Sequence, residues 1–341
     1  MKLPTISDFN LKGKRVLLRA DLDVSPKDDW RLQLLKPTLD HLIKSGAKTI
    51  IIGHRGRPQG VDGAFSLLPV AKKLEHIVKK EIQFIYDITG KETHDEIGKM
   101  QNGYIVMLEN LRFDKGEEEN DPEFVKRLAS LGDFYLNESF ADCHREHSSI
   151  VGLPKLLPHA VGFRLQKEVE NLGHILENPR HPVVVIIGGS KTEKAKYIDK
   201  LLDSVDWVLA GGILPYVVSS YCRSKDGKTC VAAAHLTPSG GDIDQASATN
   251  FAAIARVAGT IVWNGPLGEY EKKEYRSGTE IMAKAVAKNR DAYKIVGGGD
   301  TISALKKIGV LEKMDWVSTG GGAMLEYLAY GTLPGIEALK I

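Results

Sequence analysis

The clearest structural signal in this chain lies at Lys294–Leu305, which has the sequence KIVGGGDTISAL. An apolar, β-branched run leads into three consecutive glycines, Gly297–Gly299, and then into apolar residues at helical spacing. A short and continuously apolar run is typical of a strand buried on both faces of a parallel sheet. Glycine lets the backbone approach a ligand, and the helix start behind it offers free N–H groups. The stretch therefore predicts a strand–turn–helix unit whose turn can hold an anion.

The same alternation of apolar runs and amphipathic stretches extends along the chain. In the first half, strands are predicted at Arg15–Arg19, Thr49–Ile52, Gln83–Tyr86, Tyr104–Leu108 and Phe134–Leu136. In the second half, they are predicted at Val183–Ile187, Trp207–Ala210, Thr260–Trp263, Tyr293–Val296 and Asp315–Ser318. Helical patterns such as Leu67–Lys79 lie between them. Because strands alternate with helices, we predict an α/β fold of two doubly wound, Rossmann-like parallel-sheet domains.

The boundary between the two domains is predicted near 150–165. This region contains the segment GLPKLLPHAVGF, which carries two prolines and two glycines, as a linker would. A helix over about Gln166–Leu176 then joins the halves as a hinge helix. We therefore expect an N-terminal domain over 1–160, a C-terminal domain over 161–325 and a last stretch over 326–341.

Length and composition limit the class of protein. At 341 residues the chain is long enough for two cores, and 46 Lys+Arg against 44 Asp+Glu give a net charge of +2. This balance argues against a nucleic-acid binder held by bulk charge, although it allows a local basic pocket. The chain shows no signal peptide, and no apolar run approaches the roughly 20 residues that span a bilayer. We expect a cytoplasmic protein whose three cysteines, without CxxC spacing, are free thiols.

Charged and amide side chains, with Arg or His among them in each case, follow four of the five strands predicted in the first half. They are Asp21, Asp23 and Arg31 after the first strand, His54, Arg55 and Arg57 after the second, Glu109, Asn110 and Arg112 after the fourth, and Asn137, His144, Arg145 and His147 after the fifth. Because the carboxyl ends of parallel strands meet at one edge of a sheet, these side chains should gather in one pocket. Arginine has a planar fork that suits phosphate and carboxylate, so the pattern predicts a site for a small, multiply charged anion. The alternatives are solvated surface charges, or a metal site at His144 and His147 that lacks the usual carboxylate or cysteine ligands.

Glycines follow the strands of the second half instead. Gly188 and Gly189 precede Lys191 and Lys194, Gly297–Gly299 precede Asp300 and Thr301, Gly320–Gly322 follow the last strand, and Asn264-Gly265-Pro266 precedes Glu271. Glycine turns and helix starts bind phosphate, lysines add point charges, and Asp300 is the hard oxygen ligand that Mg²⁺ prefers. The combination predicts a nucleoside triphosphate site. For any single run of glycines, the alternative is that the glycines only form a tight turn. Neither GxxxxGK[ST] nor GxGxxG is present, so a P-loop ATPase and an ordinary NAD-binding domain fit poorly.

With these residues placed, the chain resembles the phosphoglycerate kinases over nearly its whole length. The matching segments are LKGKRVLLRADLDV, GHRGRP, MLENLRF, NESFADCHREHSS, GGSK, TIVWNGPLG, VGGGDT and STGGGA followed by LPG, in the family's order. The resemblance implies an enzyme, a phosphotransferase with a carboxyl acceptor. It would transfer a phosphoryl group reversibly between MgATP and 3-phosphoglycerate, giving ADP and 1,3-bisphosphoglycerate, in glycolysis or gluconeogenesis. It also implies a cytoplasmic monomer that uses Mg²⁺ and ATP/ADP and has no nucleic-acid or membrane partner.

The resemblance further implies where each substrate binds. The domain over 1–160 would take 3-phosphoglycerate, the domain over 161–325 the nucleotide, and the tail over 326–341 would return to the first domain. The acceptor site falls on Asp21, Asp23, Arg31, His54, Arg57, Arg112 and Arg145. The nucleotide site falls on Gly188, Gly189, Lys191, Lys194, Gly212, Asn264, Pro266, Glu271, Gly298, Gly299, Asp300 and Thr301, with a phosphate loop at Gly320, Gly321 and Gly322. Arg31, Lys191 and Lys194 are the implied catalytic groups, and Asp300 the implied metal ligand.

The chain departs from the family pattern in several places. It is shorter than is usual, and the loss falls between about Gly212 and Gly241, where the adenine wall would lie. The lysine spacing is one residue short, so Lys194 or Lys196 can take the second lysine's role. Asp23 replaces the family's asparagine, and Trp316 stands where a histidine is frequent. Two alternatives therefore stay open: a binding or regulatory relative with impaired catalysis, and a kinase for another phosphorylated carboxylate.

Overall fold

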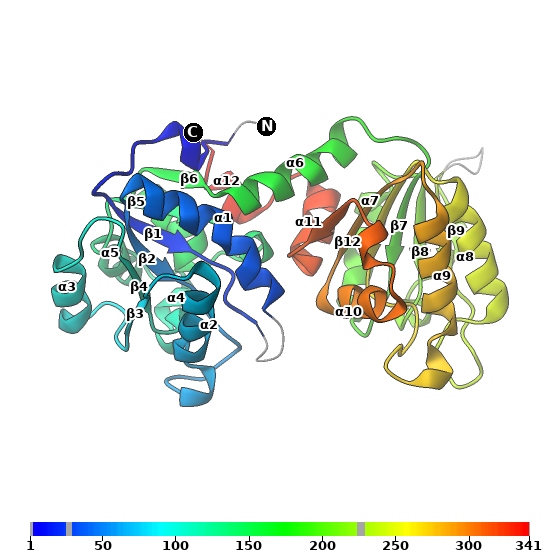
Figure 1. Ribbon diagram of the computed structural model, residues 1–341. Helices are drawn as coiled ribbons and strands as arrows, with labels where there is room; N and C mark the ends of the chain where they lie inside the picture. The colour runs from blue at the N-terminus through cyan, green and yellow to red at the C-terminus, as the bar shows by residue number, and fades with distance from the viewer. Residues whose placement is uncertain (1–2, 25–28, 224–228, 341) are drawn as a thin grey trace. The chain divides into compact units, whose positions relative to one another are not determined.

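The computed structural model describes residues 3–24, 29–223 and 229–340. The chain forms two compact units, the first comprising Met1–Val169 with Leu333–Ile341 and the second Glu170–Thr332 (Figure 1). Each unit is built on one sheet with helices packed against it, and the sheet is parallel in the first unit and mostly parallel in the second. The predicted fold class, two parallel-sheet α/β domains, is confirmed.

The sheet of the first unit has six parallel strands in the order β3-β4-β2-β1-β5-β6. Their bounds are β1 Arg15–Arg19, β2 Lys48–Ile52, β3 Gln83–Ile85, β4 Ile105–Leu108, β5 Phe134–Asn137 and β6 His159–Val161. The sequence predicts the first five. It misses β6, which lies inside the segment interpreted as a linker, because three residues between Pro158 and Gly162 are too few to show a pattern. Pairing with β5 is what makes this segment a strand.

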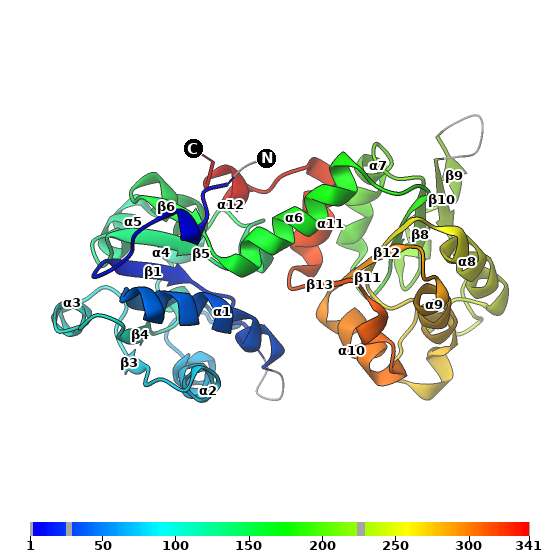
Figure 2. The same cartoon turned by 45° about the horizontal axis from the view of Figure 1, so that its top comes forward.

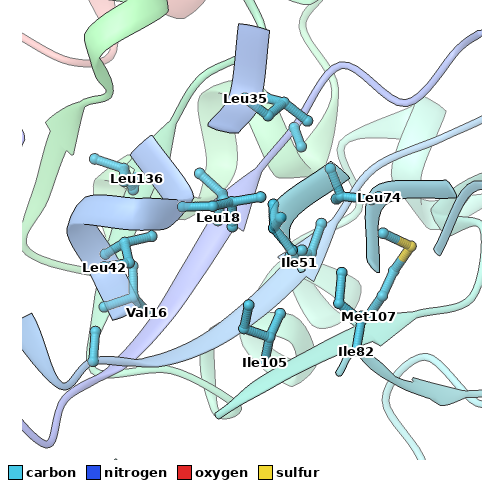
Figure 3. Close-up of a cluster of buried hydrophobic side chains, with 14 of the residues drawn as sticks. Val16, Leu18, Leu35, Leu42, Ile51, Leu74, Ile82, Ile105, Met107 and Leu136 are labelled. Carbon is cyan, nitrogen blue, oxygen red and sulfur yellow. The ribbon is translucent and has the colours of Figure 1, made fainter. Parts of the chain in front are cut away.

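The core of the first unit lies between its sheet and two helices, α1 Trp30–Ser45 and α2 Leu68–Val78. Figure 3 shows Leu35 and Leu74 from these helices against strand residues such as Leu18 and Ile51. In α1 the buried residues recur at helical spacing, and the helix ends at Gly46 in the left-handed conformation that favours glycine. The remaining helices of the unit are α3 Lys91–Gly98, α4 Gly116–Glu119, α5 Pro122–Ala129 and α12 Pro334–Glu337.

The sheet of the second unit has the order β13-β12-β11-β7-β8-β10-β9, and β9 alone is antiparallel to its neighbour. The bounds are β7 Val183–Ile187, β8 Trp207–Ala210, β9 Tyr221–Cys222, β10 Cys230–Ala233, β11 Thr260–Asn264, β12 Tyr293–Gly297 and β13 Trp316–Ser318. Strands β9 and β10 were not predicted, and both lie within the shortened region over 212–241. The five predicted strands match β7, β8, β11, β12 and β13 to within one residue at each end.

Helices cover both faces of this second sheet. On one face α8 Gln245–Val257 and α9 Ser277–Lys288 lie side by side, next to α10 Gly299–Ile308 (Figure 2). Their apolar residues pack on the strands around the fully buried Trp263 of β11. The helices α7 Ile198–Leu201 and α11 Gly321–Tyr330 pack against each other. The glycine-rich segments after β12 and β13 lead directly into the starts of α10 and α11.

The division between the units falls within α6, Phe163–Glu177, and not at 160/161 as predicted. The reason is the buried carboxylate of Glu138, which accepts hydrogen bonds from the N–H groups of Arg164 and Leu165 and fixes the first turn of α6 on the first unit. The C-terminal segment that belongs to the first unit begins at Leu333 and not at 326, because α11 extends to Tyr330 in the second unit.

The cysteine expectation is wrong for two of the three residues. Cys222 and Cys230 form a disulfide, because β9 and β10 pair antiparallel with these two residues directly opposite each other. Cys143 is a free, buried thiol. The sequence gives no sign of the bond, since a spacing of eight residues is not a recognised cysteine motif and β9 was not predicted. Among the described residues, no helix is both long and apolar enough to cross a membrane.

Candidate active site

In the first unit, several predicted acceptor-site residues meet at the carboxyl ends of β1, β2 and β4. The Arg31 guanidinium lies 3.3 Å from the Asp21 carboxylate. Asp23 accepts a hydrogen bond from the Gly56 N–H at 2.9 Å, and Arg112 donates to the Gly56 carbonyl at 2.5 Å. The glycine-containing loop after β2 thus links the acids that follow β1 to the arginine that follows β4.

Two further predicted residues, His54 and Arg145, meet at a buried carboxylate, that of Asp142. Its oxygens lie 3.4 Å from Arg145 Nε and 3.7 Å from His54 Nδ1. Arg57 is not brought into this network: its side chain is exposed and makes no hydrogen bond or ion pair with a described residue. Arg57 therefore faces solvent at the rim, while the other predicted residues lie inside or at the edge of the cluster.

Arg19 is the residue that sequence analysis missed. It is the last residue of β1 and is fully buried, with its guanidinium donating to Ser149 Oγ at 2.8 Å, the Ala20 carbonyl at 2.6 Å and Asp142 at 3.1 Å. It also lies 2.9 Å from His54 Nδ1, which must accept this bond and is therefore unprotonated at that atom. An arginine at the end of a continuously apolar strand was the available signal, because a buried guanidinium needs a counter-charge nearby.

Burial and neighbouring charge fix the ionisation of this cluster. Burial lowers the pKa of His54 to about 4 and that of His147 to about 3, so both are neutral near pH 7. Burial raises the pKa of Asp21 to about 6, with Arg31 opposing the shift. Burial also opposes ionisation of Asp142, but His54, Arg19 and the Ser139 hydroxyl hold the pKa of that carboxyl well below its usual range. The positive charge at neutral pH is therefore carried by arginines.

Some buried N–H groups of the cluster make no hydrogen bond. Within residues 3–24, 29–223 and 229–340, Arg112 Nη2 is buried without a hydrogen-bond partner, although Nε of the same guanidinium lies 3.0 Å from Glu118. Burying an unpaired guanidinium N–H is costly, and an anionic ligand would remove that cost. The first unit therefore presents planar cationic donors whose chemistry suits an anion.

In the second unit, the predicted glycine turns enclose a cavity of about 210 Å³. Its lining consists of Gly189, Ser190, Gly212, Ile213, Gly240, Gly241, Pro266, Gly268, Glu269, Glu271 and Asp300. Five of these residues were predicted. Those missed, such as Gly240 and Gly241, lie where the sequence suggested only a shortened wall. The cavity is lined mainly by backbone, as expected of a site that approaches phosphate and sugar closely.

Close backbone contacts explain the glycines of this cavity. Gly265 has a φ of +98°, and a Cβ there would lie 2.1 Å from the Gly188 carbonyl oxygen. Gly212 has a φ of +57°, and its Cβ would lie 2.5 Å from Gly189. The Gly265 N–H donates to Thr301 Oγ1 at 2.6 Å, and Asn264 donates to the Gly297 carbonyl at 3.0 Å. The turns after β7, β8, β11 and β12 are thereby locked together.

The two remaining phosphate-binding predictions concern helix starts. Gly298, with a φ of +93°, caps α10, and Gly299, Asp300 and Thr301 form its first turn. Gly320 precedes α11, and a Cβ at Gly321 would lie 2.8 Å from the Gly298 Cα. The free N–H groups at the starts of α10 and α11 are therefore neighbours, and together they favour a bound anion.

The structure distinguishes the three lysines that follow β7. Lys194 Nζ donates to the Gly188 carbonyl at 2.8 Å, and burial lowers the pKa of this lysine to about 8. Asp300 opposes that shift, and Lys191, whose side chain is exposed, adds to it. Lys196 points elsewhere, with its ammonium 4.8 Å from the ring centroid of Tyr197. Lys194 is thus the lysine that lies against the glycine turn.

Comparison with known proteins supports one family. A family model described as phosphoglycerate kinase matches residues 6–237 and 214–330. The chain belongs to the phosphoglycerate kinase family. It is 36% identical to phosphoglycerate kinase of Dictyoglomus turgidum and 37% identical to that of Moorella thermoacetica, in each case over 98% of both chains. The family membership makes it a phosphotransferase enzyme.

Solved structures of phosphoglycerate kinases have the same fold. The structure from Coxiella burnetii has a TM-score of 0.81 at 32% identity and covers 99% of both chains. The structure from Pyrococcus horikoshii has a TM-score of 0.85 at 28% identity, with 99% of this chain and 98% of that one covered. The alignment with the Dictyoglomus kinase runs over 386 positions, more than the 341 residues of this chain, so the relative has residues without a counterpart here. The shortening noted in the sequence is therefore real relative to that kinase.

Proposed function

We propose that this phosphoglycerate kinase transfers a phosphoryl group reversibly between MgATP and 3-phosphoglycerate, giving ADP and 1,3-bisphosphoglycerate. The observation that carries the proposal is the presence of two half-sites in one chain. One is a guanidinium cluster with unpartnered buried donors, and the other is a glycine-lined cavity with a lysine at its turn. The first suits a small acid with carboxylate and phosphate groups, and the second suits a nucleotide.

On the acceptor side, we assign binding to Asp21, Asp23, Arg31, His54, Arg57, Arg112 and Arg145. Arg112 suits this role best, since its buried Nη2 makes no hydrogen bond with the described residues and its planar fork matches an oxyanion. The attacking carboxylate is ionised at neutral pH, so the reaction needs no general base. Arg31 would stabilise the transferring phosphoryl group. Among the described residues its guanidinium lies 3.3 Å from the Asp21 carboxylate, 3.5 Å from the Asp23 carbonyl and 5.9 Å from the centroid of the Trp30 ring.

On the nucleotide side, we assign the phosphates to Lys191, Lys194 and the N–H groups at the starts of α10 and α11. Lys194 takes the second lysine's role in preference to Lys196, because only Lys194 contacts the Gly188 carbonyl. Glu271 lines the cavity where a ribose hydroxyl would bind, and Gly212 and Pro266 line the side of the base. Catalysis then consists of positioning and charge stabilisation.

Asp300 is the residue that would hold Mg²⁺. It lies in the first turn of α10 and lines the cavity. Within the described part of the chain, no cluster of three or more His, Cys, Asp or Glu side chains could hold a metal ion alone. Such a single carboxylate fits Mg²⁺, which is usually held by one or two carboxylates together with substrate phosphates and water. When bound, the ion would neutralise charge on the phosphates.

The test is turnover of MgATP with 3-phosphoglycerate, coupled through glyceraldehyde-3-phosphate dehydrogenase to loss of NADH. Turnover of about 1 s⁻¹ or more is expected, since that is the low end for enzymes of this type. Lys194→Ala should abolish most of it, while Lys196→Ala, matched in charge and chain position, should retain it. No turnover in a folded sample that still binds 3-phosphoglycerate would indicate a binding relative instead. Turnover only with another phosphorylated carboxylate in a substrate panel would change the assigned acceptor.

Three further expectations accompany this proposal, and they concern the pathway and location, the oligomeric state and the ligand of each unit. We propose that the enzyme serves glycolysis or gluconeogenesis in the cytoplasm, and that it acts as a monomer on small-molecule substrates. Sedimentation equilibrium at several protein concentrations tests the oligomeric state. We also propose that the first unit binds 3-phosphoglycerate and the second binds nucleotide, which calorimetry with each ligand separately can check with Arg112→Ala and Lys194→Ala variants.

A further inference from the structure

The acid Asp142 is an unexpected component of a site assigned to an anionic substrate. It follows β5 and its side chain is 7% exposed. Its carboxylate is 3.1 Å from Arg19, 3.4 Å from Arg145 and 3.7 Å from His54. It also accepts a hydrogen bond from the Ser139 hydroxyl at 2.7 Å, so its position is fixed.

We propose that Asp142 is a specificity-determining and positioning residue: a built-in anion that partly neutralises the guanidinium cluster and thereby weakens the binding of the anionic acceptor. The inference rests on the proposed function for the identity of the acceptor. The suitability of this cluster for an anion does not depend on the proposed function. It follows from Arg112 and Arg145 and from the buried N–H groups without a hydrogen bond among the described residues.

The layered arrangement of charge supports this role. The arginines that a ligand would meet first, Arg31 and Arg145, have side chains 22% and 29% exposed. Asp142 contacts Arg145 at 3.4 Å and is itself buried, so its charge is poorly screened by water. A buried negative charge behind partly exposed cations lowers the positive potential at the surface where an anion binds.

Asp142 carries its charge at neutral pH, because its pKa lies well below its usual range beside Arg19 and the Ser139 hydroxyl. Arg19, fully buried, stays protonated with Asp142 as a counter-ion. The same carboxylate adds to the burial that raises the pKa of Asp21 to about 6. His54 and His147 are neutral near pH 7, so they do not offset it. The negative charge of Asp142 therefore acts directly against any anion that approaches Arg145.

A purely structural role for Asp142 predicts something different. If the carboxylate served only to compensate Arg19, removing its charge would lower stability and leave acceptor affinity unchanged or weaker. Glu117 offers a second buried charge to Arg19 and bonds Ser149, so compensation does not depend on Asp142 alone. The proposed role thus predicts a lower KM for the acceptor, and the purely structural role an unchanged or higher one.

The experiment compares the full-length enzyme with Asp142→Asn, which keeps the shape of the side chain and removes its charge. Removing one charge within roughly 10 Å of a bound anion, at an effective dielectric constant of about 20, should tighten binding about tenfold. We expect the KM for 3-phosphoglycerate to fall by about that factor, with kcat no higher and the KM for ATP unchanged. The apparent affinity for inorganic sulfate, measured by thermal shift, should rise in parallel.

Two further variants make the comparison decisive. Asp133→Asn removes one negative charge from the same unit at the opposite end of β5, where Asp133 pairs with Arg15 at 2.6 Å, and it should leave both affinities unchanged. Asp142→Ser removes the charge with less bulk and replaces Asp142→Asn if that variant does not fold. Failure of both Asp142 variants to fold would show that the residue serves the fold and overturn the proposal.

The outcomes separate this inference from the proposed function. An unchanged or higher acceptor KM together with unchanged sulfate affinity in a folded variant overturns the inference, and so does an equal gain in Asp133→Asn. Absence of wild-type turnover with tighter sulfate binding in Asp142→Asn overturns the acceptor assignment and supports the role of Asp142. A fall in KM and tighter sulfate binding, confined to the Asp142 variants, supports both.

Discussion

The titration of Lys194 gives the most direct test of the nucleotide site. Its ammonium donates to the Gly188 carbonyl at 2.8 Å, and burial lowers the pKa of the lysine to about 8 in the empty site. A bound polyphosphate favours the protonated form and raises the pKa again. Since the complex binds more protons than the free protein, nucleotide affinity must fall as the pH rises through 8.

The size of the effect follows from the difference between the pKa of Lys194 in the free protein and its higher pKa in the nucleotide complex. With a pKa of about 8, nearly all of the free protein carries the lysine charge at pH 7 and about a tenth carries it at pH 9. The dissociation constant for ADP should therefore rise about tenfold between these pH values, equivalent to about 1.4 kcal/mol. At pH 8, binding should take up about half a proton.

Titration calorimetry with ADP, without divalent cation, measures both quantities. Running each pH in two buffers of different ionisation enthalpy gives the number of protons taken up. The charge of ADP itself stays constant here, because the second pKa of a phosphate is about 6. Lys194→Arg stays charged throughout and should show a flat profile, whereas Lys196→Arg should keep the wild-type slope. A flat wild-type profile with no proton uptake at pH 8 would refute the assignment.

Three other perturbations test different parts of the structure. Arg31→Ala should lower kcat by about a hundredfold or more and leave the dissociation constant of ATP nearly unchanged, since its charge is needed mainly in the transition state; comparable losses in steady-state kcat and calorimetric affinity would contradict this. Trp263→Phe removes the indole N–H that donates to the Gly265 carbonyl at 2.8 Å. The substitution should lower the free energy of unfolding, measured by chemical denaturation, by about 1–3 kcal/mol and weaken ADP binding. Unchanged stability would show that this bond does not hold the turn. ATP and GTP in competition should differ in kcat/KM by less than about a hundredfold, because Ile213 and the glycines at 240 and 241 offer the base no polar side chain. A larger preference for ATP would show that other residues recognise the base.

The strands that the sequence predicted are those whose burial appears in their own residues. Val183–Ile187 and Thr260–Asn264 are buried at every position, and their runs of five and four consecutive apolar or β-branched residues, Val183–Ile187 and Thr260–Trp263, were a sufficient signal. His159–Val161 and Tyr221–Cys222 were not predictable in this way, because their two or three residues become strands only by pairing with a neighbour. The disulfide depends on the same pairing, which is why the spacing of its cysteines carried no information.

The candidate site shows a similar division. Residues that follow a strand, such as Arg112 and Asp300, could be proposed from sequence because parallel strands deliver their ends to one edge of the sheet. Arg19 was missed although its place at the end of an apolar strand was a signal, and Asp142 could not be proposed, because its importance lies in its ion pair with Arg19, which joins residues from two different strand ends. Burial of both partners was the deciding observation, and it is a property of the folded chain only.

The candidate anion site of the first unit is built from side-chain charges and the cavity of the second from backbone contacts. This difference explains how a shortened chain could still carry a phosphate site. The anion site of the first unit depends on side-chain charges whose balance a single substitution can change. The cavity of the second unit depends on backbone contacts, such as those of Gly188 with Gly265 and of Gly212 with Gly189, which leave no room for a Cβ. These contacts join the ends of β7, β8 and β11, whereas beyond Gly212 the described part of the region up to 241 forms the short helix Leu214–Tyr216, β9, β10 and the turns around them. Loss of chain there can reduce the wall around the base without loosening the turns that would hold the phosphates.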